Sequence, residues 1–77
     1  MALKIEVTRE FDALRIFIGG ILHLHVKRSD LLGIQSWVRQ PESRWFIEYT
    51  LRGGNVTCDY DSEEKWKSIL EQIAEQL

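Results

Sequence analysis

The sequence predicts one α+β domain, in which about six antiparallel strands are closed by one C-terminal α-helix. Three observations lead to this fold class. Residues 2–60 consist of short segments in which apolar and polar side chains alternate, as in strands that bury one face. Glycine pairs and one proline separate these segments, which is typical of turns between antiparallel strands. Residues 62–76 instead repeat their apolar positions with a helical period. We therefore expect a single domain over residues 1–77.

The length and composition restrict the class of protein. A chain of 77 residues has room for one core, and 44% hydrophobic with 29% charged residues is the balance of a globular domain. The single cysteine, Cys58, excludes a disulfide within the chain and is typical of a reducing compartment. Met1 to Glu6 do not form a signal-peptide pattern. The sequence therefore predicts a cytoplasmic protein, and no apolar run approaches the roughly 20 residues of a membrane helix.

Three strands are expected in the first part of the chain. Their alternating apolar residues lie in segments 3–7, 14–18 and 22–26. Residues 8–13 form the first connection in this interpretation, which places Val7 opposite Leu14 and Glu6 opposite Arg15. A three-residue loop at 19–21 then pairs Ile18 with Leu22, since a slip by one residue would expose the apolar face.

Three more strands are expected in the segments 34–38, 45–51 and 56–60. The turn at 40–43 contains Pro41, which cannot donate a backbone hydrogen bond to a sheet. A two-residue turn at Gly53 and Gly54 would place Tyr49 opposite Cys58.

The last segment, 62–76, predicts an amphipathic helix. Asp61 followed three residues later by Glu64 resembles a capping box. Polar residues, Gln72 and Gln76 among them, are expected on the other, solvated face, where Glu63 and Lys67 have the spacing of a helical ion pair. The apolar stripe consists of Trp66, Ile69, Leu70, Ile73 and Leu77. We expect this stripe to cover the open apolar face of the sheet, which would form a bent sheet or a partly open barrel.

The order of elements resembles bacterial pleckstrin-homology-like (PH-like) domains, shortened at one end, and therefore implies a PH-like roll. The segment 29–73 is also similar to small flagellar proteins of the FlbD type. It has an apolar bridge at Asp30-Leu31-Leu32, a turn at Pro41, a glycine hairpin at Gly53-Gly54 and an acidic helix start. These features concern turns and periodicity, so neither resemblance implies a functional residue.

His23 and His25 are weak candidates for a metal site. Alternate residues of a strand share a face about 6.5–7 Å apart, which suits two metal ligands. A site needs further ligands, but the expected neighbours are Arg15 and Phe17. We therefore expect a solvated strand face and no metal, with a small metal-binding or ligand-binding protein as an alternative.

The sequence does not predict an enzyme or a cofactor. Cys58 shares the expected buried face of its strand with Val56 and Tyr60, and nearby Asp59 and Asp61 would oppose formation of a thiolate. Neither glycine pair leads from a strand directly into a helix, as a phosphate-binding loop does.

Trp37, Arg39, Arg44 and Phe46 are the candidate binding residues. Trp37 shares the phase of Gln35 and Arg39 and is expected on the outer face, whereas Trp45 and Phe46 must face opposite sides. An exposed tryptophan beside arginine is typical of protein interfaces and also of single-stranded nucleic-acid sites. In a third interpretation, Trp37 packs under the loop 40–44 or against the helix.

We predict a non-enzymatic protein-binding or assembly module that acts through this surface or through a sheet edge. Its partner would be another protein or a second copy in a homodimer. A single-stranded nucleic-acid-binding domain is the alternative, although the net charge of −2 argues against it.

Overall fold

The computed structural model describes residues 4–77 and confirms the predicted α+β fold. The predicted strand residue Leu3 lies outside this range. A single 3₁₀ turn, Arg28–Asp30, connects the two halves of the strand region. The elements are β1 (Ile5–Glu10), β2 (Ala13–Ile18), β3 (Ile21–Lys27), β4 (Leu31–Arg39), β5 (Arg44–Leu51), β6 (Gly54–Tyr60) and α1 (Glu63–Gln76).

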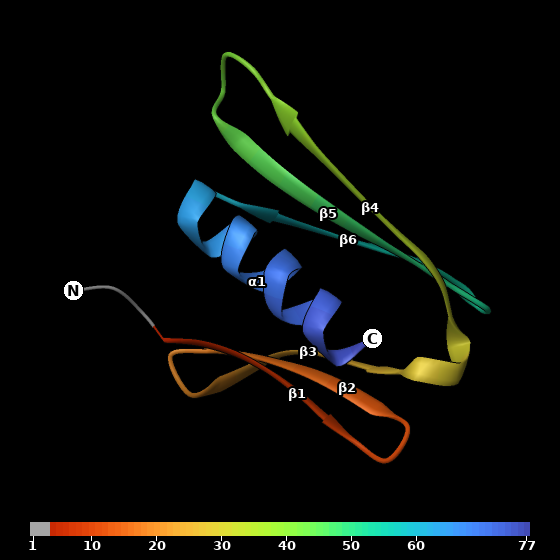
Figure 1. Cartoon of the computed structure of the whole chain (residues 1–77). Coiled ribbons are helices and arrows are strands. Elements are labelled where there is room, and N and C mark those ends of the chain that lie inside the picture. Colours follow the sequence, from red (N-terminus) through yellow and green to blue (C-terminus); the bar gives the residue numbers. More distant parts are fainter. Residues whose placement is uncertain (1–3) are drawn as a thin grey trace.

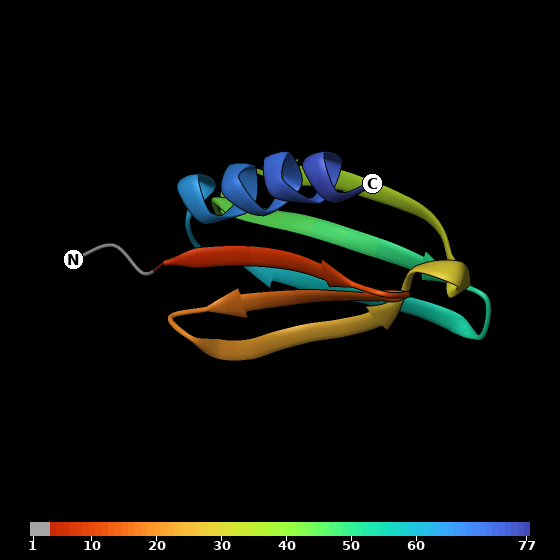
Figure 2. The same cartoon turned by 60° about the horizontal axis from the view of Figure 1, so that its bottom comes forward.

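The strands form two three-stranded antiparallel sheets, with the orders β1-β2-β3 and β4-β5-β6. They do not close into a barrel. In Figure 1 the two sheets diverge and α1 lies between them, and Figure 2 shows the helix as a separate layer. The helix packs against β1, β5 and β6. Of the two predicted arrangements, the bent sheet is therefore closer to the structure than the barrel.

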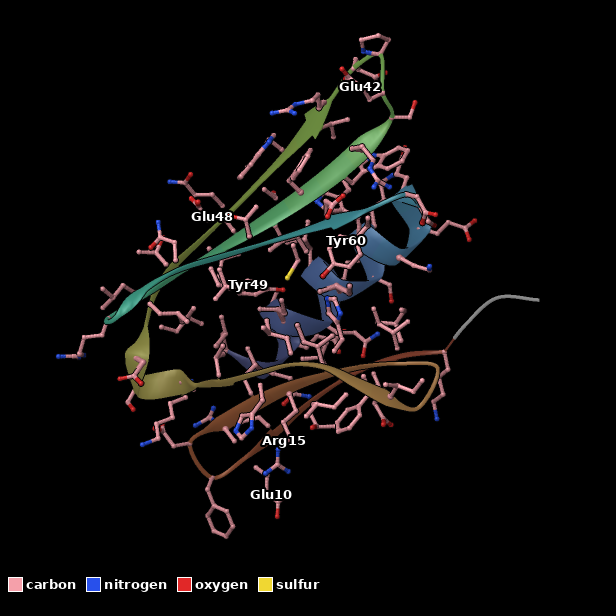
Figure 3. All side chains as sticks on the ribbon, turned by 180° about the vertical axis from the view of Figure 1, so that it is seen from behind. Glu10, Arg15, Glu42, Glu48, Tyr49 and Tyr60 are labelled. Atoms are coloured by element: carbon pink, nitrogen blue, oxygen red, sulfur yellow. The ribbon has the colours of Figure 1, made fainter. Side chains whose placement is uncertain are left out.

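The core lies between the sheets and the helix. It contains alternate residues of the strands together with two residues of the helix stripe, as the alternation predicts. Figure 3 shows Tyr49 and Tyr60 projecting into this space. The buried residues are Val7, Leu14, Ile16, Val26, Ile47, Tyr49, Tyr60, Ile69 and Ile73.

The pairing of β1 with β2 differs from the prediction. β1 continues to Glu10, so a two-residue turn replaces the expected loop 8–13. Val7 consequently pairs with Ile16, and Arg15 forms an ion pair of 3.3 Å with Glu10 rather than with Glu6. The observed register differs from the predicted one by two residues, so each strand still buries the predicted face.

The pairing of β2 with β3 follows the prediction away from its turn. Ile16 pairs with Leu24, but Ile18 pairs with Ile21 instead of the predicted Leu22. The turn has two residues, Gly19 and Gly20, both with positive φ. Ile21, which the prediction placed in the loop, belongs to β3. A bulge at His23 then restores the predicted pairing of Ile16 with Leu24.

The pairing of β5 with β6 is also shifted by two residues from the prediction. Tyr49 pairs with Val56, and Cys58 pairs with Ile47. Leu51 pairs with Gly54, so the two turn residues are Arg52 and Gly53 rather than the two glycines. Gly54 has φ +147°, a conformation that favours glycine. The buried face is again the predicted one.

The helix begins one residue later than predicted, at Glu63. Its N-cap is Ser62, whose hydroxyl accepts a hydrogen bond of 3.3 Å from the Lys65 amide, so the predicted cap at Asp61 is wrong. The predicted ion pair between Glu63 and Lys67 is present at 2.9 Å. The last residue of the predicted stripe, Leu77, follows the helix and is 50% exposed.

Two glutamines of α1 cover the free edge of β1. The Val7 amide donates to Gln72 Oε1 at 3.0 Å, and Gln72 Nε2 donates to the Ile5 carbonyl at 2.9 Å. Gln76 Nε2 donates to the Val7 carbonyl at 3.4 Å. The prediction placed both glutamines on the solvated face, which is wrong, because they provide the hydrogen bonds that a further strand would make.

Candidate binding surface

The predicted binding residues lie on the hairpin of β4 and β5. Trp37 pairs directly with Phe46, and Arg39 pairs with Arg44. Because side chains alternate along a strand, all four point to the same face of the sheet. This face is opposite the one that buries Ile47 in the core. We call Trp37, Arg39 and Phe46 the aromatic–arginine cluster.

Trp37 and Phe46 form a parallel stack. Their ring centroids are 5.3 Å apart and their planes differ by 7°. The Arg39 guanidinium lies 5.3 Å from the centre of the Phe46 ring, a distance at which a cation is attracted to an aromatic face. Trp37 remains 37% exposed. The indole of Trp37 therefore packs on the Phe46 ring within the monomer and keeps part of its surface exposed.

Arg44 shares this face but has a different role. Its guanidinium forms an ion pair of 3.0 Å with Asp59 on β6. Glu48, labelled in Figure 3, accepts a hydrogen bond of 3.3 Å from the Thr57 hydroxyl on the same face. The surface beside the cluster therefore carries both charge signs. As predicted, Trp45 faces the other side, where it packs against the core.

Within residues 4–77, β4 has an uncovered edge. By contrast, α1 covers the edge of β1. The edges of β3 and β6 share a side-chain hydrogen bond of 2.8 Å between His23 Nε2 and the Tyr60 hydroxyl. Among the described elements, only β5 packs closely against β4, which is the outermost strand of its sheet in Figure 1. An unpaired edge presents backbone donors and acceptors to any extended chain.

An open apolar hollow adjoins the start of β4. Its volume is about 350 Å³, and Leu32 and Leu77 beside it are 63% and 50% exposed. Sequence reasoning missed Leu32 as a surface residue, because it is the extra residue of a bulge at which Leu31 pairs with Leu51 and Gly33 with Thr50. The hollow is lined by Arg28, Leu31, Leu32, Gly33, Ile34 and Leu77.

The structure does not bring His23 and His25 together on one face. His23 is the extra residue of the β3 bulge, and its ring bonds to Tyr60 between the sheets, whereas His25 pairs with Arg15. Partial burial lowers the pKa of His23 below its ordinary value. Within residues 4–77, no group of three or more histidine, cysteine, aspartate or glutamate side chains has a metal-binding arrangement.

Cys58 is partly buried near Tyr49 and Tyr60. Burial raises the pKa of the Cys58 thiol and the pKa values of both tyrosines. Thiolate formation is therefore disfavoured, which agrees with the interpretation of Cys58 as a small packing residue.

Comparisons with protein-family models, curated proteins and solved structures found no match. Within the described chain, no helix combines the length and the apolar character that a membrane crossing requires.

Proposed function

We propose that this protein is a non-enzymatic protein-binding or assembly module, and that it binds through the outer face and the free edge of the β4–β5 hairpin. The observation that carries the proposal is the stacked aromatic–arginine cluster beside an uncovered edge strand. A cytoplasmic location and independence from cofactors are parts of the same proposal. They rest on the single cysteine and on the absence of a catalytic pattern in the sequence.

The chemistry of the cluster suits a protein partner. Tryptophan, phenylalanine and arginine are enriched where protein interfaces bury their central residues. The contacts of Phe46 with Trp37 and Arg39 reduce the conformational freedom that these side chains would lose on binding. The free backbone groups of β4 add a second contact, because an extended segment of a partner can pair with them.

Single-stranded nucleic acid is the second candidate, since a flat aromatic pair with an arginine is also a platform for base stacking. The surrounding charges favour protein. Asp59 already neutralises Arg44, Glu48 lies on the same face, and the net charge is −2. A nucleic-acid site needs several cations that remain available to phosphates.

The proposal is tested by affinity capture from the host lysate, with and without nuclease. The baits are the wild-type protein, Trp37→Ala and Phe11→Ala. Phe11 is a matched control, because it is an aromatic residue that is 92% exposed in the turn between β1 and β2. Circular dichroism establishes that each bait is folded.

We expect a stoichiometric protein that survives nuclease, is retained by Phe11→Ala and is lost with Trp37→Ala. A partner that disappears with nuclease would support the nucleic-acid candidate instead. Equal capture by all three baits would contradict the proposed surface. The proposal would also be contradicted if the wild-type protein captured nothing and did not associate with itself.

A further inference from the structure

We infer that one partner of this surface is a second copy of the same chain, and that the two copies pair antiparallel through β4 with Gln35 opposite Gln35. The inference rests on the proposed function and specifies its partner. The result is a two-fold symmetric dimer in which the two β4–β5–β6 sheets join into one continuous sheet.

The edge of β4 has a bulge at Leu32, and the regular segment 33–38 that follows it carries no feature that prevents strands from pairing. Residues 31–38 contain no charged residue and no proline, and the strand is nine residues long. Charges, proline and bulges are usual means by which edge strands avoid association, and the bulge of β4 lies before the segment 33–38. With Gln35 at the centre, the first charged residue of β4, Arg39, lies near the bulged start of β4 in the other copy, so the two arginines are far apart.

The outer face is complementary in this register. Trp37 of one copy lies opposite Gly33 of the other, and a Cβ atom at Gly33 would meet no atom within 4 Å. Gly33 therefore leaves room for the indole ring, and an aromatic residue across from a strand glycine is a stabilising pair. The pairing would cover part of the surface of Trp37 that the monomer exposes.

The inner face is complementary as well. Val38 shares the phase of Trp45 and is 40% exposed in the monomer. In the dimer it lies near the bulged residue Leu32 of the other copy, at the apolar hollow formed by the start of β4 and Leu77. Each copy then places its valine in the hollow of the other. A register centred on Trp37 would leave both hollows unfilled.

The charges agree with the same register. Arg39 of one copy lies near the bulged start of β4 in the other, and Asp30 immediately precedes that start. Asp30 faces Arg52 at 3.8 Å, a distance that leaves its carboxylate able to accept a second cation. Opposite charges are thus adjacent at both ends of the paired strands.

Sedimentation velocity from about 5 µM to about 500 µM tests the inference, since this range detects even a weak dimer. We expect the wild-type protein to dimerise with increasing concentration. Gln35→Lys and Gln35→Glu each place like charges at the symmetry axis and should raise the dissociation constant more than about tenfold. An equimolar mixture should restore a one-to-one dimer, because opposite charges then meet.

Thr57→Lys is the matched control. Thr57 and Gln35 both pair with Glu48, one from β6 and one from β4, so both lysines meet the same carboxylate within the monomer. The control should dimerise like the wild-type protein. If the wild-type protein stays monomeric at about 500 µM, a second copy is not the partner. Affinity capture of another protein that is lost with Trp37→Ala would still support the proposed function. A dimer that Gln35→Lys leaves intact, or a mixture without rescue, would overturn the register.

Discussion

The Gln72 side chain makes the hydrogen bonds to the backbone of β1 that a neighbouring strand would otherwise make. Its amide group both accepts from and donates to the backbone of β1, and it also donates to the Ser68 hydroxyl at 3.0 Å. Sequence reasoning placed Gln72 in solvent, because glutamine in an amphipathic helix usually lies on the polar face. Only the position of α1 beside an unpaired edge, which is a tertiary feature, gives this glutamine its role.

Replacing Gln72 with leucine should lower the free energy of unfolding by about 1–3 kcal/mol. The variant leaves the Val7 amide and the Ile5 carbonyl without partners at a partly buried site. Urea denaturation measures the change. Glu71→Leu is the control, because Glu71 is exposed on the same helix. Equal effects of the two substitutions would contradict the role of Gln72.

Stability should fall in mild acid because of His23. Partial burial lowers the pKa of His23 in the folded protein, so the unfolded chain binds a proton more readily. The contribution of His23 is therefore complete above the unfolded pKa of about 6.5 and is lost as pH falls through the lower, folded pKa.

Thermal melting between pH 7.5 and pH 5 measures this effect. His23→Gln should reduce the loss of melting temperature relative to the wild-type protein, whereas His25→Gln on the same strand should not. An unchanged pH dependence in His23→Gln would show that His23 does not couple protonation to folding.

At the scale of elements, the faces of the strands were predictable but two of the hairpin registers were not. Alternation defines which side of a strand is buried, and a shift by two residues preserves that side. The choice between two registers that differ by two residues depends on the geometry of the turn. Phe11 has φ 55°, so the β1–β2 turn is tight without any glycine to indicate it. The turn between β5 and β6 begins at Arg52, one residue before the glycine pair. The residue types alone do not distinguish this turn from the predicted turn at Gly53 and Gly54.

The start of α1 gives a prediction at this scale. Ser62→Ala should destabilise the protein by about 1 kcal/mol, because it removes the acceptor of the Lys65 amide. Asp61→Ala should cost less, since it loses only an exposed ion pair of 3.8 Å with Lys65. Urea denaturation compares the two variants. A larger effect at Asp61 would contradict the observed cap.

At the scale of the whole molecule, part of the candidate site was predictable. Alternation along the strands predicted that Trp37 and Arg39 share the outer face and that Phe46 faces the side opposite Trp45. The engagement of Arg44 by Asp59 was not predicted, because it depends on the register of β6. The free edge of β4 also depends on how the strands divide into two sheets, which local pattern does not determine.

Hydrogen exchange measured by mass spectrometry tests most directly whether the β4–β5 hairpin is the binding surface. The free protein is compared, at low concentration, with its complex with the captured partner or with the concentrated dimer. We expect rapid exchange in residues 31–39 of the free protein, because an open edge leaves backbone amides accessible. Exchange there should slow on binding while residues 5–10 change little. Unchanged exchange over residues 31–51, with slowing elsewhere, would contradict the proposed surface.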